Sequence, residues 1–500
     1  MELFGEALPA LMKFFSWPAP LFLVVGSLLG MIFGVLPGLG GPQVVALLLP
    51  LTYGMDPSLA MVLLIGAMGA VPFGGSITAI LINTPGTGQS AATCFDGYPL
   101  ARQGKAGMAI GASATASCLG AIFGAVILTL ILPVGKQVVM AFSYPEYFML
   151  ALMGLSVIAA ISGGALWKGL VAACLGLLLS TIGYDPITGS VRFTFGSDYL
   201  WDGIKLLPAF IGLFAVGEAL DLFLQREKIA QVDDSCQSVV GVMEGVRAVF
   251  RHFGLFIRCS VIGTIIGIIP GVGGATANFL AYGHAVQTAK DPEKFGTGDI
   301  RGVIAPESSN NAKDGGTLVP TLIVGIPGGI ETAVLLGALI LLGLEPGPQM
   351  MVDNPEVVLV IIYTLVAANI LVSAIGLFGA RMLWRITFVP TTLLAPVIFM
   401  LGLIGAYVSD GMVADVIIAV VFGIVAYAMK LFGFSRVPLV IALVLGKLAQ
   451  KTFHQTLMRW GVIGFFTRPI SLGLFVVIIL MLTAPYWLGR WQRHLASREK

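Results

Sequence analysis

The sequence predicts an all-α polytopic membrane protein that contains two inverted repeats with broken or re-entrant helices. Of its 500 residues, 57% are hydrophobic and 11% are charged, whereas an ordinary soluble domain is about 25% charged. The mean hydropathy is +0.95. Apolar runs near the ~20 residues that cross a bilayer as a helix recur along the chain, so we expect about 10 to 12 crossings. The clearest runs are 18–36, 107–134, 146–166, 205–224, 255–270, 356–380, 391–408, 411–429 and 470–489.

The same composition disfavours several functional classes. The formal net charge is +2 and no long basic run occurs, which argues against a nucleic-acid partner. The 5 cysteines and 4 histidines are dispersed without metal-ligand spacing, so we expect neither a metal site nor a resident cofactor. The chain has no nucleotide-binding P-loop, no GxSxG serine motif and no metalloprotease helix, which disfavours an enzyme.

Two Gly/Pro motifs recur in the same order along the chain. The stretch GVLPGLGG at 34–41 reappears as GIIPGVGG at 267–274, an offset of 233 residues (267 − 34). A second pair follows at offsets of 241 to 242. Ordered matches at a nearly constant offset predict two structural repeats, and each motif is expected to interrupt a membrane helix. The second pair consists of GGS at 74–76 with NTPGT at 83–87, and GGT at 315–317 with GIPGG at 325–329.

The loops between matched motifs differ in charge, which predicts that the repeats are inverted. Loop 53–58 holds a single acid, whereas its counterpart at 290–313 contains four bases; loop 96–106 contains two bases, whereas its counterpart at 344–356 contains three acids and no base. By the positive-inside rule, matched loops lie on opposite sides of the membrane. The expected division is a first transmembrane repeat at 1–225, a cytoplasmic linker at 226–254, a second repeat at 255–460, and a C-terminal helix with a basic cytoplasmic tail at 461–500.

Inverted repeats of this kind place a substrate near the membrane midplane, between broken helices whose positive N-terminal ends point at anions. The segment 83–93 collects amides and hydroxyls, and Gly86 and Gly88 permit backbone N–H groups to converge on a carboxylate. The segment 327–332 repeats this pattern in the second half. The predicted substrate-binding residues are Gly74, Gly75, Ser76, Asn83, Thr84, Pro85, Gly86, Thr87, Ser90, Asn310, Asn311, Gly315, Gly316, Thr317, Pro327, Gly328 and Gly329.

A dense polar cluster, ESSNN at 307–311, precedes the second interruption. Its oxygen atoms suit a hard cation such as Na⁺ as well as the polar groups of a solute. Glu331, which follows the interruption, could bind a cation, pair with a base or cap its helix. The predicted coupling-ion residues are Gly38, Gly40, Gly271, Gly273, Glu307 and Glu331.

Other interpretations of these patterns stay open. The Gly/Pro motifs could serve tight helix packing without ligand contact, and the polar cluster could be a hydrophilic cytoplasmic loop in which Asn310-Asn311 forms a turn. A polar, aromatic-rich segment around Arg192, at 184–201, is expected to be an exposed loop and a candidate docking surface for another subunit.

Several motifs occur together in this sequence, and their combination is specific. They are PGLGG at 37–41, GGS at 74–76 through NTPGT at 83–87, DGYPL at 96–100, and PESSNN at 306–311 through GIPG at 325–328. Over essentially the whole chain it resembles the large transmembrane subunit of bacterial tripartite tricarboxylate transporters. The resemblance implies a secondary transporter that takes citrate-like or other carboxylates from a periplasmic solute-binding protein. It also implies a small four-helix membrane subunit as partner and an ion gradient, usually Na⁺, as the driving force without ATP.

One pair of residues departs from that resemblance. Where small residues are expected after Ala312, this chain has Lys313-Asp314. Lys313 could contact the anion directly, or the two side chains could form a self-neutralising ion pair. The departure leaves the identity of the carboxylate open.

The patterns predict a multi-pass membrane transporter, and the resemblance implies that it lies in the bacterial inner membrane and imports a di- or tricarboxylate with a Na⁺ or H⁺ gradient. Alternating access would follow from one part of the repeat core moving against the other. One rival is a channel or pore for carboxylates without ion coupling. Another is a membrane-embedded component of an enzyme or redox complex, which would need a catalytic group that the sequence lacks. Membrane lipid is the remaining expected partner.

Overall fold

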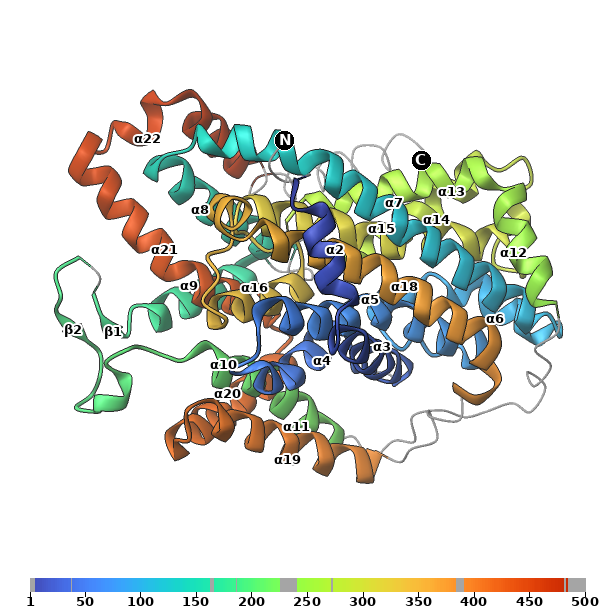
Figure 1. Ribbon diagram of the computed structural model, residues 1–500, viewed down its shortest axis with the longest axis horizontal. Helices are drawn as coiled ribbons and strands as arrows, with labels where there is room; N and C mark the ends of the chain where they lie inside the picture. Colours follow the sequence, from blue (N-terminus) through green and yellow to red (C-terminus); the bar gives the residue numbers. More distant parts are fainter. Residues whose placement is uncertain are drawn as a thin grey trace, which may run out of the picture. The chain divides into compact units, whose positions relative to one another are not determined.

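The computed structural model describes residues 5–36, 38–161, 166–185, 187–224, 241–270, 273–383, 391–480 and 483. Helices make up most of these residues (Figure 1), which confirms the predicted fold class. The chain divides into two compact units. Unit 1 contains Met1–Lys136 and Leu207–Tyr427, and unit 2 contains Gln137–Leu206 and Ala428–Lys500.

The helices that lie wholly or mostly in unit 1 come from both halves of the sequence. The first half supplies α2 (Ala7–Phe15), α3 (Ala19–Val35), α4 (Gly41–Leu48), the 3-10 helix η1 (Leu49–Thr52), α5 (Pro57–Ile82), the 3-10 helix η2 (Gly88–Ala91), α6 (Cys94–Arg102), α7 (Ala106–Met140), α10 (Leu206–Phe210), the π-helical η4 (Ile211–Val216) and α11 (Gly217–Leu224). The second half supplies α12 (Val242–Arg251), α13 (Phe253–Ile268), α14 (Gly274–Thr288), the 3-10 helix η6 (Pro292–Lys294), α15 (Arg301–Ile323), α16 (Ile330–Leu341), α17 (Pro348–Asp353), α18 (Pro355–Leu383), α19 (Thr391–Asp410) and α20 (Val413–Leu431).

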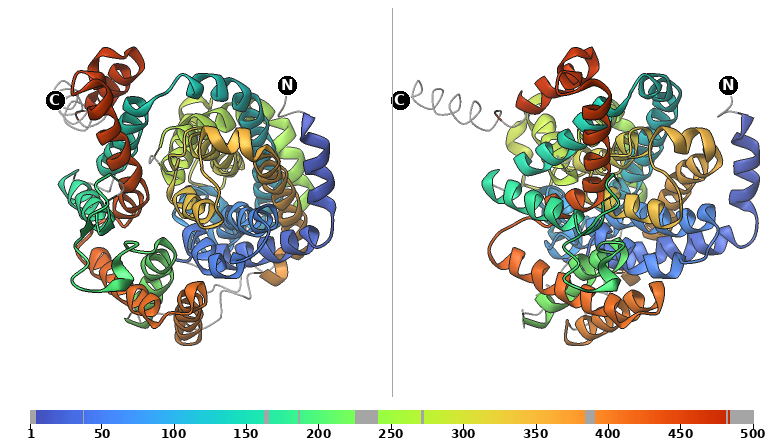
Figure 2. Two further views of the ribbon diagram at one scale, coloured as in Figure 1. Left: turned by 60° about the vertical axis from the view of Figure 1, so that its left-hand side comes forward. Right: turned by 90° about the vertical axis from the view of Figure 1, so that its left-hand side faces the viewer.

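The centre of unit 1 contains α5 and α15. α5 is buried from Ala60 to Ile82 and α15 from Gly302 to Ile323. In both views of Figure 2, the yellow-green helices of the second half lie next to the blue helices of the first half. For α5 this burial follows from its apolar sequence. α15 is buried although it carries the ESSNN cluster, so its polar side chains must find partners inside the protein.

The two halves pack their helices through glycines at equivalent positions. A Cβ on Gly74 of α5 would lie 3.1 Å from the Cα of Gly34 on α3, and a Cβ on Gly316 of α15 would lie 3.1 Å from the Cα of Gly267 on α13. Gly34 and Gly267 are equivalent in the first motif (267 − 34 = 233), and Gly74 and Gly316 differ by 242 residues. Small residues permit such close approach of helices. The repeated motifs therefore form two similarly packed helix pairs.

The glycine pairs at 74–75 and 315–316 do not interrupt their helices, contrary to expectation. Both pairs lie inside the continuous helices α5 and α15. A Cβ on Gly315 would lie 2.6 Å from the Cα of Gly124 on α7. At these positions the structure supports the alternative interpretation, tight helix packing. The interruptions come later, at Asn83 after α5 and at Val324 after α15.

Several helices are long and apolar enough to cross a membrane. Among the described residues there are five such helices, and up to seven if the bent pairs α2/α3 and α12/α13 each count as one span. This is fewer than the expected ten to twelve. Two of the expected runs, 391–408 and 470–489, contain apolar helices too short to be counted, Leu393–Val408 and Pro469–Leu480. The higher number of crossings stays a prediction.

Unit 2 packs α21 (Val437–Trp460) against α8 (Tyr144–Ile161) and α9 (Leu166–Ser180). It also contains η3 (Asp198–Leu200), α22 (Gly464–Thr467) and an apolar helix at Pro469–Leu480. Its hairpin pairs β1 (Gly183–Tyr184) with β2 (Val191–Arg192) in antiparallel register.

The segment expected to be a docking surface, 184–201, begins in this hairpin and continues beyond it. Arg192 forms an ion pair with the buried Asp185, while Phe193 and Phe195 beside it are exposed. The segment is therefore exposed as predicted, and its role in docking stays a prediction.

Candidate functional site

Both helix interruptions have the same local chemistry. α5 ends at Asn83, whose φ of 52° is left-handed, and α15 is followed by Gly325 with a φ of 79°. Asn and Gly adopt this backbone more readily than other residues. Pro85 and Pro327 each follow two residues later, where proline cannot continue a helix ladder. The two left-handed residues are therefore 242 residues apart (325 − 83).

A glycine after each proline lets the interrupted segment lie directly on the helix that it has just left. Gly86 donates its N–H to the carbonyl of Gly75 at 3.3 Å, and a Cβ on Gly86 would lie 2.8 Å from the Cα of Gly75. Gly328 donates its N–H to Thr321 Oγ1 at 3.2 Å, and a Cβ on it would lie 2.6 Å from the Cα of Thr317. A side chain at either position would displace the segment, so both glycines are needed for the shape of the interruption.

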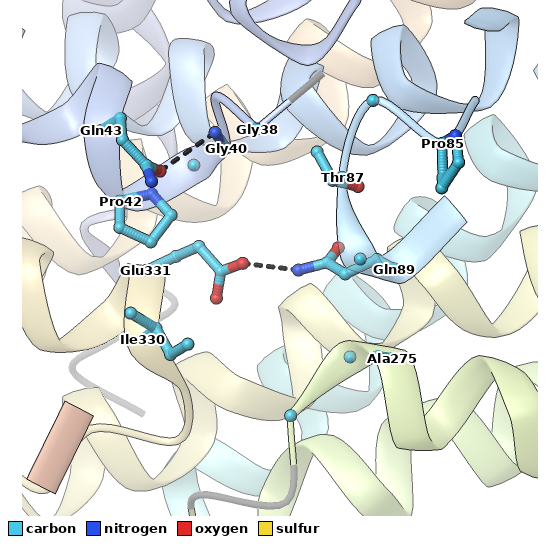
Figure 3. Close-up of a pocket in the computed structure, with 15 residues that line it drawn as sticks. Gly38, Gly40, Pro42, Gln43, Pro85, Thr87, Gln89, Ala275, Ile330 and Glu331 are labelled. Carbon is cyan, nitrogen blue, oxygen red and sulfur yellow. Dashed lines mark hydrogen bonds between the residues drawn. The ribbon is translucent and has the colours of Figure 1, made fainter. Parts of the chain in front are cut away.

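A cavity of about 350 Å³ lies where the repeated motifs meet (Figure 3). Three helices begin at its wall: α4 at Gly41, α14 at Gly274 and α16 at Ile330. The first N–H groups of a helix have no intrahelical acceptor, and the helix dipole adds partial positive charge there. The wall therefore suits an anion. The cavity is lined by Gly38, Gly40, Gly41, Pro42, Gln43, Pro85, Gly86, Thr87, Gly88, Gln89, Gly273, Gly274, Ala275, Ile330 and Glu331.

Glu331 and Gln89 point toward each other across this cavity (Figure 3), and Gln89 Nε2 donates to Glu331 Oε1 at 2.5 Å. Their surroundings are reciprocal. A Cβ on Gly41 would lie 2.6 Å from Cγ of Glu331, and a Cβ on Gly274 would lie 2.9 Å from Cδ of Gln89. In the repeats Gly41 is equivalent to Gly274, and Gln89 is equivalent to Glu331. Each of these two contacts is therefore the counterpart of the other in the opposite repeat. An approximate twofold axis produces this pattern, and its orientation relative to a membrane stays a prediction.

The cavity contains part of the predicted set of site residues. Those that line it are Gly38, Gly40, Pro85, Gly86, Thr87, Gly273 and Glu331. Gly271 lies outside the described residues. The predicted residues that do not line it are Gly74, Gly75, Ser76, Asn83, Thr84, Ser90, Glu307, Asn310, Asn311, Gly315, Gly316, Thr317, Pro327, Gly328 and Gly329. Contact with substrate stays a prediction for all of them.

The predicted set of site residues omits more than half of the residues that line the cavity. A signal for the main omission was present, because Gln89 stands 242 residues before Glu331 and extending the repeat alignment by two residues pairs them. Gly41 and Gly274 are likewise the last letters of the first motif. The lining residues outside the predicted set are Gly41, Pro42, Gln43, Gly88, Gln89, Gly274, Ala275 and Ile330. Of these, Gly88 was expected to help expose backbone N–H groups.

Glu307 is fully buried away from this cavity, in a cage of hydroxyl groups. Its carboxylate accepts hydrogen bonds from Ser76 Oγ at 2.7 Å, Thr93 Oγ1 at 2.5 Å and Ser117 Oγ at 2.9 Å. These donors come from α5, the residue before α6, and α7. Among the described residues no Lys, Arg or His lies within 4.0 Å of this carboxylate in an ion pair that the structure records. Such a cage suits a carboxylate that exchanges a proton or a small hard cation.

The alternative interpretation, in which Asn310-Asn311 forms a turn in a cytoplasmic loop, is wrong. Both residues lie inside α15 and are fully buried. Asn311 Nδ2 donates to Asn369 Oδ1 on α18 at 2.5 Å, whereas neither polar atom of the Asn310 amide has a hydrogen-bond partner among the described residues. Because an unpaired buried amide costs stability, Asn310 is a candidate ligand-binding residue.

Lys313 and Asp314 form the self-neutralising ion pair that was one of the two expectations. Lys313 Nζ lies 2.7 Å from Asp314 Oδ1 and 4.0 Å from Glu331 Oε1, and both side chains of the pair are at most 3% exposed. Lys313 does not line the cavity. The geometry therefore disfavours direct contact between its ammonium and an anion in the cavity.

The loop between α14 and α15 is fastened to α6. Asp96 Oδ1 accepts hydrogen bonds from three backbone N–H groups of residues 296–299 at 2.8 to 2.9 Å. In the same loop, hydrogen bonds from Lys294 and then from Arg301 lower the pKa of Asp291 to about 2. Asp291 is therefore ionised at neutral pH. The hydrogen bonds of Asp96 join an element of the first repeat to one of the second.

The fold and the cavity define a polytopic α-helical membrane protein in which interrupted helices from two repeats surround a cavity whose wall suits an anion, an arrangement that occurs in transporters. The chain belongs to the tripartite tricarboxylate transporter TctA family, whose model matches residues 21–441. It is therefore a transport protein of the membrane that works with other components of a tripartite transporter.

Two proteins of Agrobacterium vitis are similar to the chain. One, described as an uncharacterized 52.8 kDa protein in the TAR-I ttuC' 3' region, is 34% identical over 455 residues, which cover 91% of this chain and 90% of that protein. The other, described as an uncharacterized protein in the TAR-II ttuC' 3' region, is 32% identical over 228 residues, which cover 45% of this chain and 94% of that protein. No solved structure matches the chain.

Proposed function

We propose that the chain is the substrate-translocating subunit of a secondary active transporter that imports a di- or tricarboxylate, with a Na⁺ or H⁺ gradient as the driving force. In this proposal the chain catalyses no chemical reaction and holds no resident cofactor. It resides in the bacterial inner membrane. Its partners are a small four-helix membrane subunit and a periplasmic solute-binding protein that delivers the carboxylate.

The observation that carries the proposal is the convergence of three helix N-termini, drawn from both repeats, on one cavity. Backbone N–H groups near Gly41, Gly274 and Ile330 can bind carboxylate oxygens without a buried cation. Gln43 and Thr87 add donors that suit a second carboxylate or a hydroxyl group. The volume of about 350 Å³ falls in the range of small-molecule sites, about 300–1,000 Å³.

Two acidic sites are available for the coupling ion. Glu331 faces the cavity, so an ion bound there would respond directly to the substrate. Glu307 lies apart from the cavity in its hydroxyl cage, where protonation or a bound Na⁺ would remove an uncompensated buried charge. We assign the exchangeable ion to Glu307, because its ligands join α15 to α5 and α7 and would sense movement between these helices.

The test is uptake of a panel of labelled carboxylates into proteoliposomes that contain the chain and its small partner subunit, with the solute-binding protein added outside. The expected result is accumulation that requires both the binding protein and an inward Na⁺ or H⁺ gradient. Omitting each gradient in turn identifies the ion. Downhill flux that needs neither the gradient nor the binding protein would contradict the proposal and favour a carboxylate channel.

A further inference from the structure

The ion pair at Lys313 has a feature that charge neutralisation alone does not explain. The ammonium lies between two carboxylates, 2.7 Å from Asp314 Oδ1 and 4.0 Å from Glu331 Oε1. One of these carboxylates belongs to α15 and the other belongs to the cavity wall at the start of α16. A hard cation coordinated by oxygen atoms commonly occupies such a position between carboxylates.

The surroundings of the ammonium contain further acceptors that have no donor. Asp314 Oδ2 and Gln89 Oε1 are buried atoms without a hydrogen-bond partner among the described residues. Gln89 lies close to the lysine, because a Cβ on Gly274 would lie 2.5 Å from Cε of Lys313 and 2.9 Å from Cδ of Gln89. Carboxylate and amide oxygens from three elements therefore surround one place that the lysine side chain fills.

We propose that Lys313 is a tethered cation that permanently occupies a cation site beside the substrate cavity, a site that a free Na⁺ would otherwise take. The inference rests on the proposed transport function and makes its ion requirement more specific. With both carboxylates ionised, the trio of Lys313, Asp314 and Glu331 has a net charge of −1. Removing the ammonium changes this to −2, and one bound Na⁺ restores it.

A tethered ammonium differs from Na⁺ in one respect that matters for transport. Lys313 stabilises Glu331 at the wall when a substrate binds, but it cannot leave with the substrate. This position therefore contributes no co-transported Na⁺ in the wild-type protein. A variant without the ammonium should bind a Na⁺ there and release it with the substrate, which adds a Na⁺ requirement.

The test compares the purified full-length wild type with Lys313→Met, Lys313→Arg and the double variant Lys313→Met/Asp314→Asn, each in NaCl and in choline chloride of equal ionic strength. Ligand-linked stabilisation raises Tm. For Lys313→Met we expect Tm in Na⁺ to exceed Tm in choline by about 2 °C or more beyond any wild-type difference. Lys313→Arg keeps the positive charge, and the double variant lacks the carboxylate of Asp314. Neither variant should therefore show the additional Na⁺-dependent rise in Tm.

A Na⁺ response of Lys313→Met no larger than that of the wild type would overturn the inference. If Lys313→Met folds only in one buffer, recovery of monodisperse protein from membranes solubilised in Na⁺ or in choline replaces Tm. The inference then requires recovery in Na⁺ alone, and failure in both buffers contradicts it. These measurements detect Na⁺ binding and not transport. A negative result therefore overturns the inference about Lys313 but says nothing against carboxylate uptake. Conversely, a wild-type protein that takes up no carboxylate would refute the proposed function without changing the Tm comparison.

Discussion

Gln89 and Glu331 are equivalent residues of the two repeats (331 − 89 = 242), and their side chains meet, with Nε2 of one donating to Oε1 of the other at 2.5 Å. A hydrogen bond on a twofold axis needs a donor on one side and an acceptor on the other. Two identical glutamates at this position would repel, and two glutamines would remove the acidic group. Because the first repeat has a glutamine and the second has a glutamate at this position, the two equivalent side chains can form a hydrogen bond in the cavity wall.

The hydrogen bond between Gln89 and Glu331 predicts that carboxylate binding requires one amide and one carboxylate at these two positions, whichever position carries which. Gln89→Glu places a second carboxylate opposite Glu331, and like-charge repulsion together with the added negative charge should weaken substrate binding at least about tenfold. The exchange Gln89→Glu/Glu331→Gln restores one donor and one acceptor and should recover most of the affinity. Substrate titration of purified protein and the KM of uptake measure both. Equal weakening in the single and the exchanged variants would show that the contact has no such role.

The glycine on the first interruption should be indispensable for stability. Gly86→Ala forces a Cβ to within 2.8 Å of the Cα of Gly75, so we expect the free energy of unfolding to fall by about 1–3 kcal/mol. Gly88 is the matched control because a Cβ there meets nothing within 4 Å. Thermal unfolding monitored by size-exclusion recovery should separate the two variants. Equal loss in Gly88→Ala would mean that the segment as a whole, and not the close approach of Gly86, sets stability.

Adjacent asparagines of α15 should respond in opposite ways to the same substitution. Asn310→Leu removes an amide that has no partner, so stability should hold or rise, while uptake should be lost if the amide binds a transported species. Asn311→Leu takes the partner from Asn369 Oδ1 and should cost about 1–3 kcal/mol of stability. Unfolding and uptake of both variants are measured side by side. Normal uptake by Asn310→Leu would remove this residue from the transport site.

If the exchangeable ion binds to Glu307 in its hydroxyl cage, loss of this carboxylate should abolish substrate accumulation but not substrate exchange. Glu307→Gln keeps the size of the side chain but cannot gain or lose the exchangeable ion. Gradient-driven accumulation should therefore fall to background, while exchange of labelled for unlabelled substrate across the membrane persists. Ser117→Ala, which removes one of three donors, is the milder control. Accumulation by Glu307→Gln at the wild-type level would move the coupling ion elsewhere.

Much of the fold could be predicted because its signals are local. Hydropathy identifies apolar helices, and Asn or Gly followed two residues later by proline favours the end of a helix, as at Asn83 and Gly325. The prediction that the glycines at 74–75 and 315–316 interrupt their helices is wrong for a related reason. A glycine in a sequence permits an interruption and close packing equally, and the neighbouring helix decides between them.

By itself, the sequence determined the membrane class, the repeated motifs and the places where α5 and α15 end, since hydropathy and backbone restriction act within a few residues. Only the tertiary structure decided that Gln89 meets Glu331, that three hydroxyl groups surround Glu307, and that Lys313 lies between two carboxylates. Apart from the adjacent pair Lys313 and Asp314, these partners come from different helices. Their contacts depend on how buried helices pack, and no pattern within a short segment encodes that packing.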